Sequence, residues 1–346
     1  MRINVEMMIK GDSMKKKVIV CIILIVCLSG CSLFTSNVKR LNKVSYDSVM
    51  CFYAYGRNFN GSTTQYIMAI MNNKESIPVL AIDKANGLTE MYLNHEENKL
   101  FIYSDVAYGV NSENEYTVGR SIVTYDLKKN KATYNEQDDK NDDVFCLLTE
   151  HGTLEQVYGI KKDRVNAAKL IKSNLVVAYD DNKLQLQKRG EDKIIKDIVL
   201  SQYYGIHSIE VDGDKLYVVG HNAEKKIVIT LFDSQLNEIS SNVIGTYSHM
   251  ELRVDDGNLL ALASITEKKN EKCLIQITAN LVPKVVCDNV LTDTLFYLKK
   301  TQEYIYYDQN LKKYKVLDKE GVEKSEFSVS IKQDGYNYPY GFLYID

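Results

Sequence analysis

The sequence lacks the short motifs that mark common catalytic and cofactor sites. It has no HExxH pair, GxSxG elbow, phosphate-binding loop or dinucleotide-binding glycine fingerprint. Five histidines are scattered along the chain, at positions 95, 151, 207, 221 and 249. Catalytic triads are defined by geometry rather than by order in the chain, so the sequence does not decide whether a nucleophile and a base meet in space. It therefore predicts no catalytic residue and no cofactor, and it leaves enzymatic activity open.

The chain also lacks an excess of basic residues. It has 43 Lys and Arg against 46 Asp and Glu, a formal net charge of −3 at pH 7. Lysines and acidic residues alternate along the chain, which is typical of a solvated surface. A nucleic-acid-binding protein would need a basic patch or stripe. We therefore do not expect nucleic acid among its partners.

The main apolar run is too short for a membrane-spanning helix. It covers eleven residues, 18–28, and follows three lysines at 15–17. A spanning helix takes about 20 apolar residues to cross the hydrocarbon core. A basic stretch followed by a short apolar run is instead typical of a secretory signal peptide.

This apolar run ends in Leu28-Ser29-Gly30-Cys31, which resembles the lipobox of bacterial lipoproteins. In that family the cysteine is acylated and the peptide is cut just before it. The resemblance, which covers residues 14–31, therefore implies that Cys31 is the lipidated first residue of the mature protein. Two or three acyl chains anchor a protein stably where one binds only marginally. The implied location is extracytoplasmic, on the cell membrane, and the composition favours a Gram-positive bacterium as the source.

These features divide the chain into four parts. Residues 1–13 do not fit a signal peptide, and we expect translation to start at Met14. Residues 14–30 are the predicted signal peptide, and residues 31–44 are the lipidated cysteine with a polar tether. Residues 45–346 are the predicted folded domain.

The predicted domain has four cysteines, at positions 51, 146, 273 and 287. They show no CxxC or other spacing typical of a zinc site. Cys273 and Cys287 lie symmetrically about Asn280 in a predicted hairpin. If the turn is centred there, their Cβ atoms lie opposite each other, within the range that a disulfide needs. The alternative is two buried free thiols.

Alternation of apolar and polar residues, with many Tyr, Val and Ile, predicts an all-β fold. A pattern of turn, apolar strand, polar turn and second strand recurs every 41 to 45 residues in the second half of the chain. The first strand of each copy is anchored, in order, near Tyr53, Leu100, Leu175, Leu216, Leu259 and Tyr304. The gap between the second and third anchors leaves room for one short or irregular copy at 144–158. About seven units follow from this count.

Repeats of this length with about four strands each are typical of β-propeller blades. At the level of strand periodicity, residues 45–346 resemble the seven-bladed WD40-like and quinoprotein-like propellers, although the chain has no tryptophan and so no Trp-Asp pair. The resemblance implies seven blades of about 43 residues. Six or eight blades, or another large antiparallel β fold such as a sandwich or barrel, stay open.

Two stretches depart from this regular pattern. Residues 153–172 are the only segment that hints at a helix. The C-terminal stretch 335–346, with Tyr336, Tyr338 and Tyr340, is expected to add a strand to the first or last blade. That strand would close the ring and cover an open sheet edge.

An acidic loop is the only candidate metal site. Asp139, Asn141, Asp143 and Glu150 match positions 1, 3, 5 and 12 of an EF-hand calcium loop. Position 6 should be Gly for the sharp turn, and here it is Val144. A solvated loop between strands is the alternative, so calcium is only a weak candidate and we expect no other metal.

Aromatic and histidine side chains mark a candidate face for a ligand or partner. Tyr204, His207, Tyr247 and His249 hold near-equivalent places, just before the first strand of two successive units. In a propeller this connection reaches toward the rim of the central channel. Tyr and His there can stack on a sugar ring or anchor a protein partner. The alternative is that these rings pack between blades.

The sequence favours a non-enzymatic binding or scaffolding module, anchored to the membrane, for an envelope protein or glycan. This hypothesis needs no catalytic residues, and it depends on analogy from the fold. One alternative is a carbohydrate-active enzyme whose carboxylates come from several blades. Another is the solute-binding lipoprotein of a transporter, but those receptors are α/β proteins and the chain lacks regular alternation of strands and helices.

Overall fold

The computed structural model describes residues 37–59, 62–83, 85–110, 116–137, 145–157, 164–245, 247–255, 257–265, 271–290, 295–298, 301–308, 310–328 and 339–344. The chain divides into two units, Met1–Asn37 and Val38–Asp346. Cys31 and the predicted signal peptide lie outside the described residues, so the lipid anchor stays a prediction. Within the described ranges, no helix is long and apolar enough to cross a membrane.

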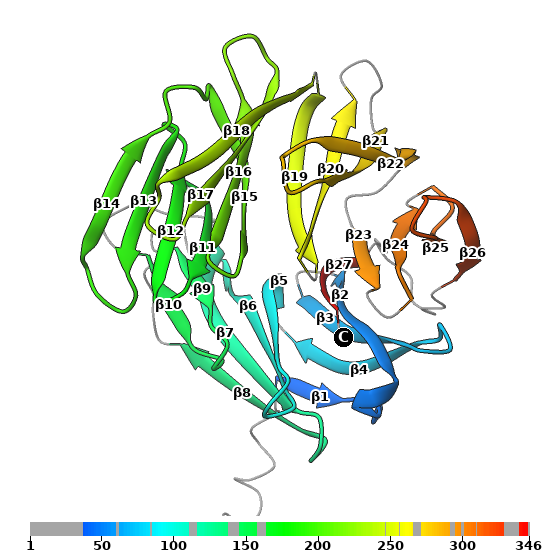
Figure 1. Cartoon of the computed structure of the whole chain (residues 1–346). Coiled ribbons are helices and arrows are strands. Elements are labelled where there is room, and N and C mark those ends of the chain that lie inside the picture. Colours follow the sequence, from blue (N-terminus) through cyan, green and yellow to red (C-terminus); the bar gives the residue numbers. More distant parts are fainter. Residues whose placement is uncertain are drawn as a thin grey trace, which may run out of the picture. The chain divides into compact units, whose positions relative to one another are not determined.

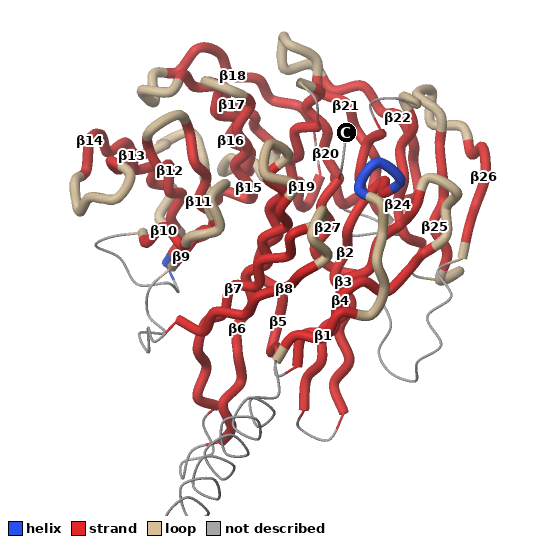
Figure 2. Tube along the Cα trace, turned by 90° about the horizontal axis from the view of Figure 1, so that it is seen from below, coloured by secondary structure: helices blue, strands red, loops and turns tan. Residues whose placement is uncertain are grey.

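The second unit begins and ends in one five-stranded antiparallel sheet, which we call blade 1. Its strand order is β1-β4-β3-β2-β27. These strands are β1 (Val38–Arg40), β2 (Val49–Phe59), β3 (Ser62–Met71), β4 (Ser76–Asp83) and β27 (Pro339–Tyr344). Strands dominate the described residues, and a single 3-10 turn, η1 (Tyr46–Ser48), precedes β2 (Figure 2).

Five four-stranded antiparallel sheets, blades 2 to 6, take their strands in chain order. Blade 2 has β5 (Ala85–Asn94), β6 (Lys99–Val110), β7 (Tyr116–Asp126) and β8 (Lys131–Gln137). Blade 3 has β11 (Val165–Ile171), β12 (Asn174–Tyr179), β13 (Lys183–Lys188) and β14 (Ile194–Val199). Blade 4 has β15 (Gly205–Asp212), β16 (Lys215–His221), β17 (Ile227–Asp233) and β18 (Glu238–Gly245). Blade 5 has β19 (Tyr247–Asp255), β20 (Asn258–Ile265), β21 (Lys272–Ile277) and β22 (Pro283–Val290). Blade 6 has β23 (Leu295–Leu298), β24 (Glu303–Asp308), β25 (Lys313–Leu317) and β26 (Glu323–Phe327).

The fold is therefore a β-propeller with six blades, and the prediction of seven was wrong. The short copy expected at 144–158 is a two-stranded hairpin in the described residues, formed by β9 (Cys146–Leu148) and β10 (Leu154–Gln156). Among the described residues this copy contributes a two-stranded sheet and not a four-stranded blade. The helix expected over 153–172 was also wrong, because its described residues include β10 and β11.

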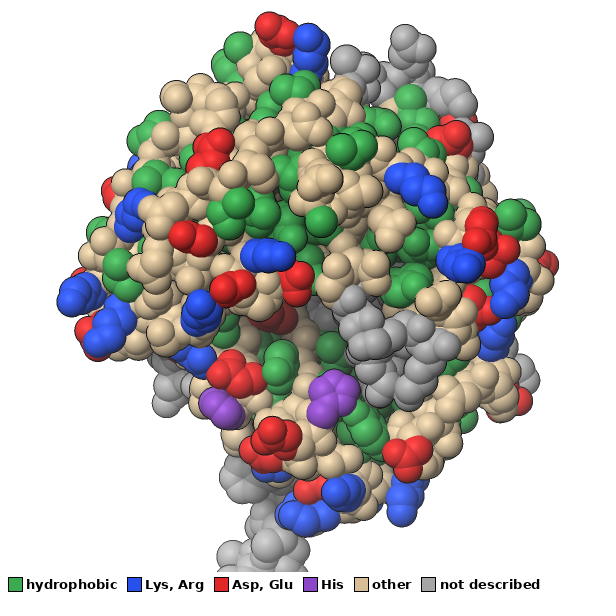
Figure 3. Space-filling view, in the orientation of Figure 1, with side chains coloured by type: hydrophobic (Ala, Val, Ile, Leu, Met, Phe, Trp, Pro, Cys, Tyr) green, Lys and Arg blue, Asp and Glu red, His purple; other side chains and the backbone are tan. Residues whose placement is uncertain are grey.

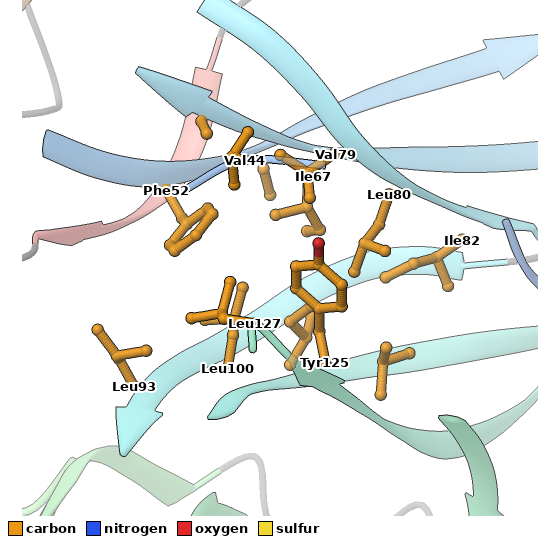
Figure 4. Close-up of a cluster of buried hydrophobic side chains, with 14 of the residues drawn as sticks. Val44, Phe52, Ile67, Val79, Leu80, Ile82, Leu93, Leu100, Tyr125 and Leu127 are labelled. Carbon is orange, nitrogen blue, oxygen red and sulfur yellow. The ribbon is translucent and has the colours of Figure 1, made fainter. Parts of the chain in front are cut away.

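Apolar clusters between successive sheets build the ring of the second unit. They join blade 1 to blade 2, blade 2 to the β9–β10 hairpin, the hairpin to blade 3, and then each blade to the next. A further cluster joins blade 6 back to blade 1. Figure 4 shows the cluster between blades 1 and 2, where Phe52 and Ile67 from blade 1 meet Leu100 and Tyr125 from blade 2.

Position within a blade explains the sequence pattern of each strand. A middle strand such as β16 or β24 is packed on both faces by neighbouring blades, so it reads as a nearly continuous apolar run and is buried along its length. The outermost strands β14 and β18 are mostly exposed and alternate with polar residues. The repeat anchors found in the sequence are therefore the buried second strands of the blades.

The C-terminal strand closes the ring, as predicted. β27 pairs antiparallel with β2, with Phe52 opposite Leu343, and in Figure 1 it lies in red beside the blue β2. Blade 1 thus combines strands from both ends of the second unit, and β27 covers an edge of β2 that would otherwise be open. Tyr340 belongs to this strand, whereas Tyr336 and Tyr338 lie outside the described residues.

Candidate functional site

A cavity of about 380 Å³ lies where the first strands of blades 3 to 6 approach one another. Its walls include Lys169 from β11, Glu210 from β15, Glu251 and Arg253 from β19, and Leu295 from β23. We call it the inner cavity. Figure 3 shows one face of the molecule, which is hollowed near its middle and has acidic and basic side chains nearby. A space of this size matches the smaller ligand pockets of proteins, which start at about 300 Å³.

Three charges of the inner cavity occupy the same position in successive blades. Each of them lies one residue before the partner of a repeat anchor on the neighbouring strand. Lys169 precedes the partner of Leu175, Glu210 precedes the partner of Leu216, and Arg253 precedes the partner of Leu259. The wall therefore alternates positive, negative and positive from blade 3 to blade 5. This regularity is present in the sequence, but the repeat was recognised from its apolar anchors, and the charges on the neighbouring strand were missed.

Hydrogen bonds hold these charges in place. Lys169 Nζ lies 2.9 Å from Glu210 Oε2, an ion pair that links blade 3 to blade 4. Arg253 Nη1 donates a hydrogen bond of 2.6 Å to the carbonyl oxygen of Leu295, which links blade 5 to blade 6. The cavity thus presents carboxylate, ammonium and guanidinium groups, which together accept and donate hydrogen bonds.

A further carboxylate, that of Glu90 on β5, interacts electrostatically with Lys169. It accepts a hydrogen bond of 2.8 Å from the backbone N–H of Leu148 in the β9–β10 hairpin. Burial raises the pKa of Glu90, and the Leu148 hydrogen bond and the Lys169 charge partly oppose that rise. No motif or repeat position in the sequence had marked this residue.

Three histidines meet where blade 4 faces blade 5, and we call them the histidine cluster. His207 Nε2 lies 2.9 Å from His221 Nδ1. The ring centroids of His207 and His249 are 4.7 Å apart. His249 Nε2 in turn lies 3.3 Å from Glu251 Oε1, and Glu251 lines the inner cavity. The cluster and the cavity are therefore joined through direct contacts.

The environment of the histidine cluster keeps His207 neutral. Burial, followed by the neighbouring His249 and His221 rings, lowers the pKa of His207 to about 4. A neutral imidazole combines one donor and one acceptor nitrogen, so at neutral pH His207 can relay a hydrogen bond between two partners. Among the described residues, no group of three His, Cys, Asp or Glu side chains is arranged to hold a metal ion.

The structure separates the two predicted tyrosines. Tyr204 is 72% exposed, and its ring centroid lies 5.6 Å from that of His221, so it extends the histidine cluster toward solvent. Tyr247 instead packs against the apolar cluster between blades 4 and 5. Tyr204 precedes the first residue of β15, whereas Tyr247 is the first residue of β19 and pairs with Ile265 of β20.

His221 was not predicted from the sequence, although a signal for it was available. His207 and His221 lie six and seven residues from the turn at Gly213-Asp214, on opposite sides of it. A hairpin centred on that turn places two such residues close together. β15 and β16 form this hairpin, with Gly205 opposite His221.

The structure does not test most of the predicted calcium site. Asp139, Asn141 and Asp143 lie outside the described residues. Glu150 is described, and both of its carboxylate oxygens are bonded to Arg189, at 2.9 and 3.3 Å. This hydrogen bonding lowers the pKa of Glu150. Glu150 therefore already has a cationic partner in the structure.

The possible disulfide is not formed: Cys273 and Cys287 both stay thiols, and they donate to the Oδ1 and the carbonyl oxygen of Asp288. The hairpin turn is centred at Asn280 as expected, with Ile277 opposite Pro283. A register shift between Ile275 and Leu274, farther along the hairpin, places Cys287 opposite Leu274 instead of Cys273. The two cysteines consequently join different apolar clusters, Cys273 between blades 4 and 5 and Cys287 between blades 5 and 6. They lie on opposite faces of blade 5.

The fold defines a β-propeller, and comparisons with solved structures agree with this class. No family model and no curated protein matches the chain. A putative 6-phosphogluconolactonase from Bacteroides fragilis NCTC 9343 is similar, with 12% identity and a TM-score of 0.59 over 88% of this chain and 100% of that one. An uncharacterized protein from Listeria monocytogenes EGD-e is similar with 14% identity and a TM-score of 0.50, over 87% of this chain and 97% of that one. At such low identity the similarity establishes the fold alone.

Proposed function

We propose that this protein is a non-enzymatic module that binds a glycan of the cell envelope at the inner cavity, while Cys31 anchors the chain to the membrane. The inner cavity is the observation that carries the proposal. A space of about 380 Å³ suits one or two sugar rings, and it is too small to receive the surface of a folded protein.

The chemistry of the walls supports a sugar ligand. Sugar hydroxyls both donate and accept hydrogen bonds, and Glu251 and Arg253 supply the matching acceptors and donors. Tyr204, exposed beside the histidine cluster, offers an aromatic face on which an apolar sugar face can stack. The ligand would thus contact groups on blades 4 and 5.

Binding can be tested by calorimetric titration of the full-length protein with soluble fragments of bacterial cell wall. Replacing Tyr204 by Ala should weaken binding about fivefold, since a ring contact is worth about 1 kcal/mol. Glu251→Gln should weaken binding as well. The matched control is Val199→Ala, which truncates a side chain that is 71% exposed on the outermost strand β14. Equal affinities in all three variants would refute binding at this cavity.

The anchor needs a separate test in cells. Wild-type protein should sediment with membranes, and Cys31→Ala should be released in soluble form, because acyl chains supply the membrane affinity. In-cell crosslinking of the anchored protein, with Cys31→Ala as control, then identifies neighbours in the envelope. Recovery of a single protein and no glycan would replace the glycan proposal by a scaffold for that protein.

One observation favours an enzyme as the second candidate. The inner cavity contains two carboxylates from adjacent blades, Glu210 and Glu251. Glycoside hydrolases use a pair of carboxylates across the scissile bond. If this candidate holds, incubation of the same cell-wall fragments with the wild-type protein should release shortened products. Glu210→Gln and Glu251→Gln should abolish this release, and intact fragments after incubation with wild type exclude this activity.

A further inference from the structure

The hydrogen bonds of the histidine cluster assign every ring proton of the His207–His221 pair. The backbone N–H of Met250 on β19 donates to His207 Nδ1 at 3.3 Å, so this nitrogen carries no proton. The proton of neutral His207 is therefore on Nε2, which donates to His221 Nδ1 at 2.9 Å. His221 Nδ1 is an acceptor, so the proton of neutral His221 is on its Nε2.

This assignment leaves no free position for an additional proton. The two nitrogens of the pair that have a lone pair are His207 Nδ1 and His221 Nδ1, and both already accept a hydrogen bond. A proton on His207 Nδ1 breaks the bond from Met250. A proton on His221 Nδ1 sets two N–H groups against each other. Uptake of one proton thus costs one hydrogen bond wherever it binds.

The bond from Met250 joins two blades. His207 and His221 belong to β15 and β16 of blade 4, whereas Met250 belongs to β19 of blade 5. β19 also contributes Glu251 and Arg253 to the inner cavity. A second hydrogen bond crosses the same boundary, from the N–H of Leu252 to Ser208 Oγ at 3.3 Å, and no imidazole takes part in it.

The charged and titratable neighbours of the pair come from the same two blades. The His249 ring on β19 lies against the His207 ring at a tilt of 34°, and Glu251 on β19 contacts His249. Tyr204, which precedes β15, lies against His221. Glu210 of β15 faces Lys169. The ring beside His207 is therefore another imidazole and, after burial, it is the largest cause of the lowered pKa of His207.

We propose that His207, held in place by His221, is an acid-sensitive latch that keeps β19 of blade 5 against blade 4 while its Nδ1 accepts from Met250 N–H, and that releases β19 when this nitrogen takes up a proton. The latch does not depend on any ligand. It predicts local opening at Met250, next to the inner cavity, before the rest of the boundary loosens. The low pKa of His207, about 4, means that release begins only in clearly acidic conditions.

Amide hydrogen exchange of the full-length protein, resolved to single residues and corrected for the intrinsic effect of pH, tests the latch. Between neutral pH and about pH 4, protection of the Met250 amide should fall about tenfold, the size expected for loss of one hydrogen bond. The Leu252 amide should keep its protection over this range. Equal loss at both amides would overturn the proposal, because it indicates general loosening by acid.

His207→Asn is the decisive variant. The side-chain oxygen of Asn can accept from Met250 N–H in place of Nδ1, but it takes up no proton at these pH values. Protection at Met250 should then stay constant with pH. His151→Asn, which replaces a histidine with a 69% exposed side chain in the β9–β10 turn, should behave like wild type. A pH dependence in His207→Asn that equals that of wild type would refute the latch.

A second readout covers the case in which His207→Asn does not fold. In the wild-type protein, exchange of the imidazole carbon-bound proton reports the titration of His207 itself. Its midpoint should coincide with the loss of protection at Met250. If the His207 midpoint differs by more than about one pH unit from the pH at which the Met250 amide loses protection, another group controls the opening.

Discussion

Arg189 of blade 3 should hold the two-stranded β9–β10 hairpin in place. Its Nη1 and Nη2 bind the two oxygens of Glu150, at 2.9 and 3.3 Å, and its Nε binds Glu155 Oε2 at 3.2 Å. An isolated hairpin of two strands is marginally stable at best. This hairpin therefore depends on its contacts with blades 2 and 3, and we expect Arg189→Met to weaken its attachment.

The expected loss in free energy of unfolding follows from how exposed the paired side chains are. The side chains of Arg189, Glu150 and Glu155 are 25%, 34% and 13% exposed. An exposed ion pair contributes about 0 to 1 kcal/mol, and the bidentate pair with Glu150 falls at the upper end of that range. Glu155 is more buried, so loss of its charged partner adds about 1 kcal/mol. Methionine keeps most of the apolar stem, so we expect a total loss of about 2 kcal/mol.

Two measurements on Arg189→Met test this reasoning. Urea unfolding should show the loss in free energy, and amide exchange should accelerate over residues 145–157 more than elsewhere. The matched control is Arg164→Met in the same blade, whose ion pairs with Asp180 and Asp181 are about half exposed and should be worth less than about 0.5 kcal/mol. Equal losses in the two variants, or unchanged exchange in the hairpin, would refute the role of Arg189.

The same ion pair predicts a dependence on pH. The hydrogen bonds from Arg189 lower the pKa of Glu150 in the folded state. A group with a lowered folded pKa contributes stability that is present above its unfolded value, near 4.5, and is lost as the pH falls through the folded value. Wild type should therefore lose more stability than Arg189→Met as the pH falls below 4.5. Parallel pH profiles would contradict the assignment.

Three further predictions concern the blades. Gly321→Ala should lower the free energy of unfolding in urea by more than about 2 kcal/mol, because φ is +85° and an added Cβ would overlap a carbonyl oxygen of β22. Gly213→Ala is the control: its φ is +60°, but the added Cβ meets open space, so the loss should be about 1 kcal/mol. Deletion of residues 339–346 uncovers the edge of β2, so it should cause self-association beyond the wild-type state on size-exclusion chromatography. A synthetic peptide of these residues should restore the wild-type elution, and an unaltered elution of the deletion variant would count against ring closure by β27. Peptide mapping without reductant should recover Cys273 and Cys287 as separate thiols, and a peptide cross-linked between them would contradict the register of blade 5.

The sequence predicted the fold class and the closing strand because both follow from local patterns. The alternation of apolar and polar residues identifies strands, and the recurrence of Leu175, Leu216 and Leu259 identifies blades. The number of blades was overestimated, because a copy that forms only a hairpin still has a buried strand and a turn. Counting anchors cannot distinguish two strands from four.

The candidate site was predicted in part. His207, His249 and Tyr204 were found from their place before the apolar anchor strands, and these three side chains do belong to one connected group with His221. Tyr247 was assigned to the same face, but it packs against the apolar cluster between blades 4 and 5. The possible bridge between Cys273 and Cys287 does not form, because a register shift in the β21–β22 hairpin reverses the faces of the residues beyond it.

By itself, the sequence determined which segments are strands, where they turn, and how they repeat, because these properties depend on neighbours within a few residues of each other. It also carried the alternating charges of Lys169, Glu210 and Arg253 in equivalent positions. Only the tertiary structure decided which side chains face the inner cavity, which enter the core, and which histidines share a proton network. Those outcomes depend on bulges of one residue and on contacts between blades about 40 residues apart, and no local pattern in the chain specifies either.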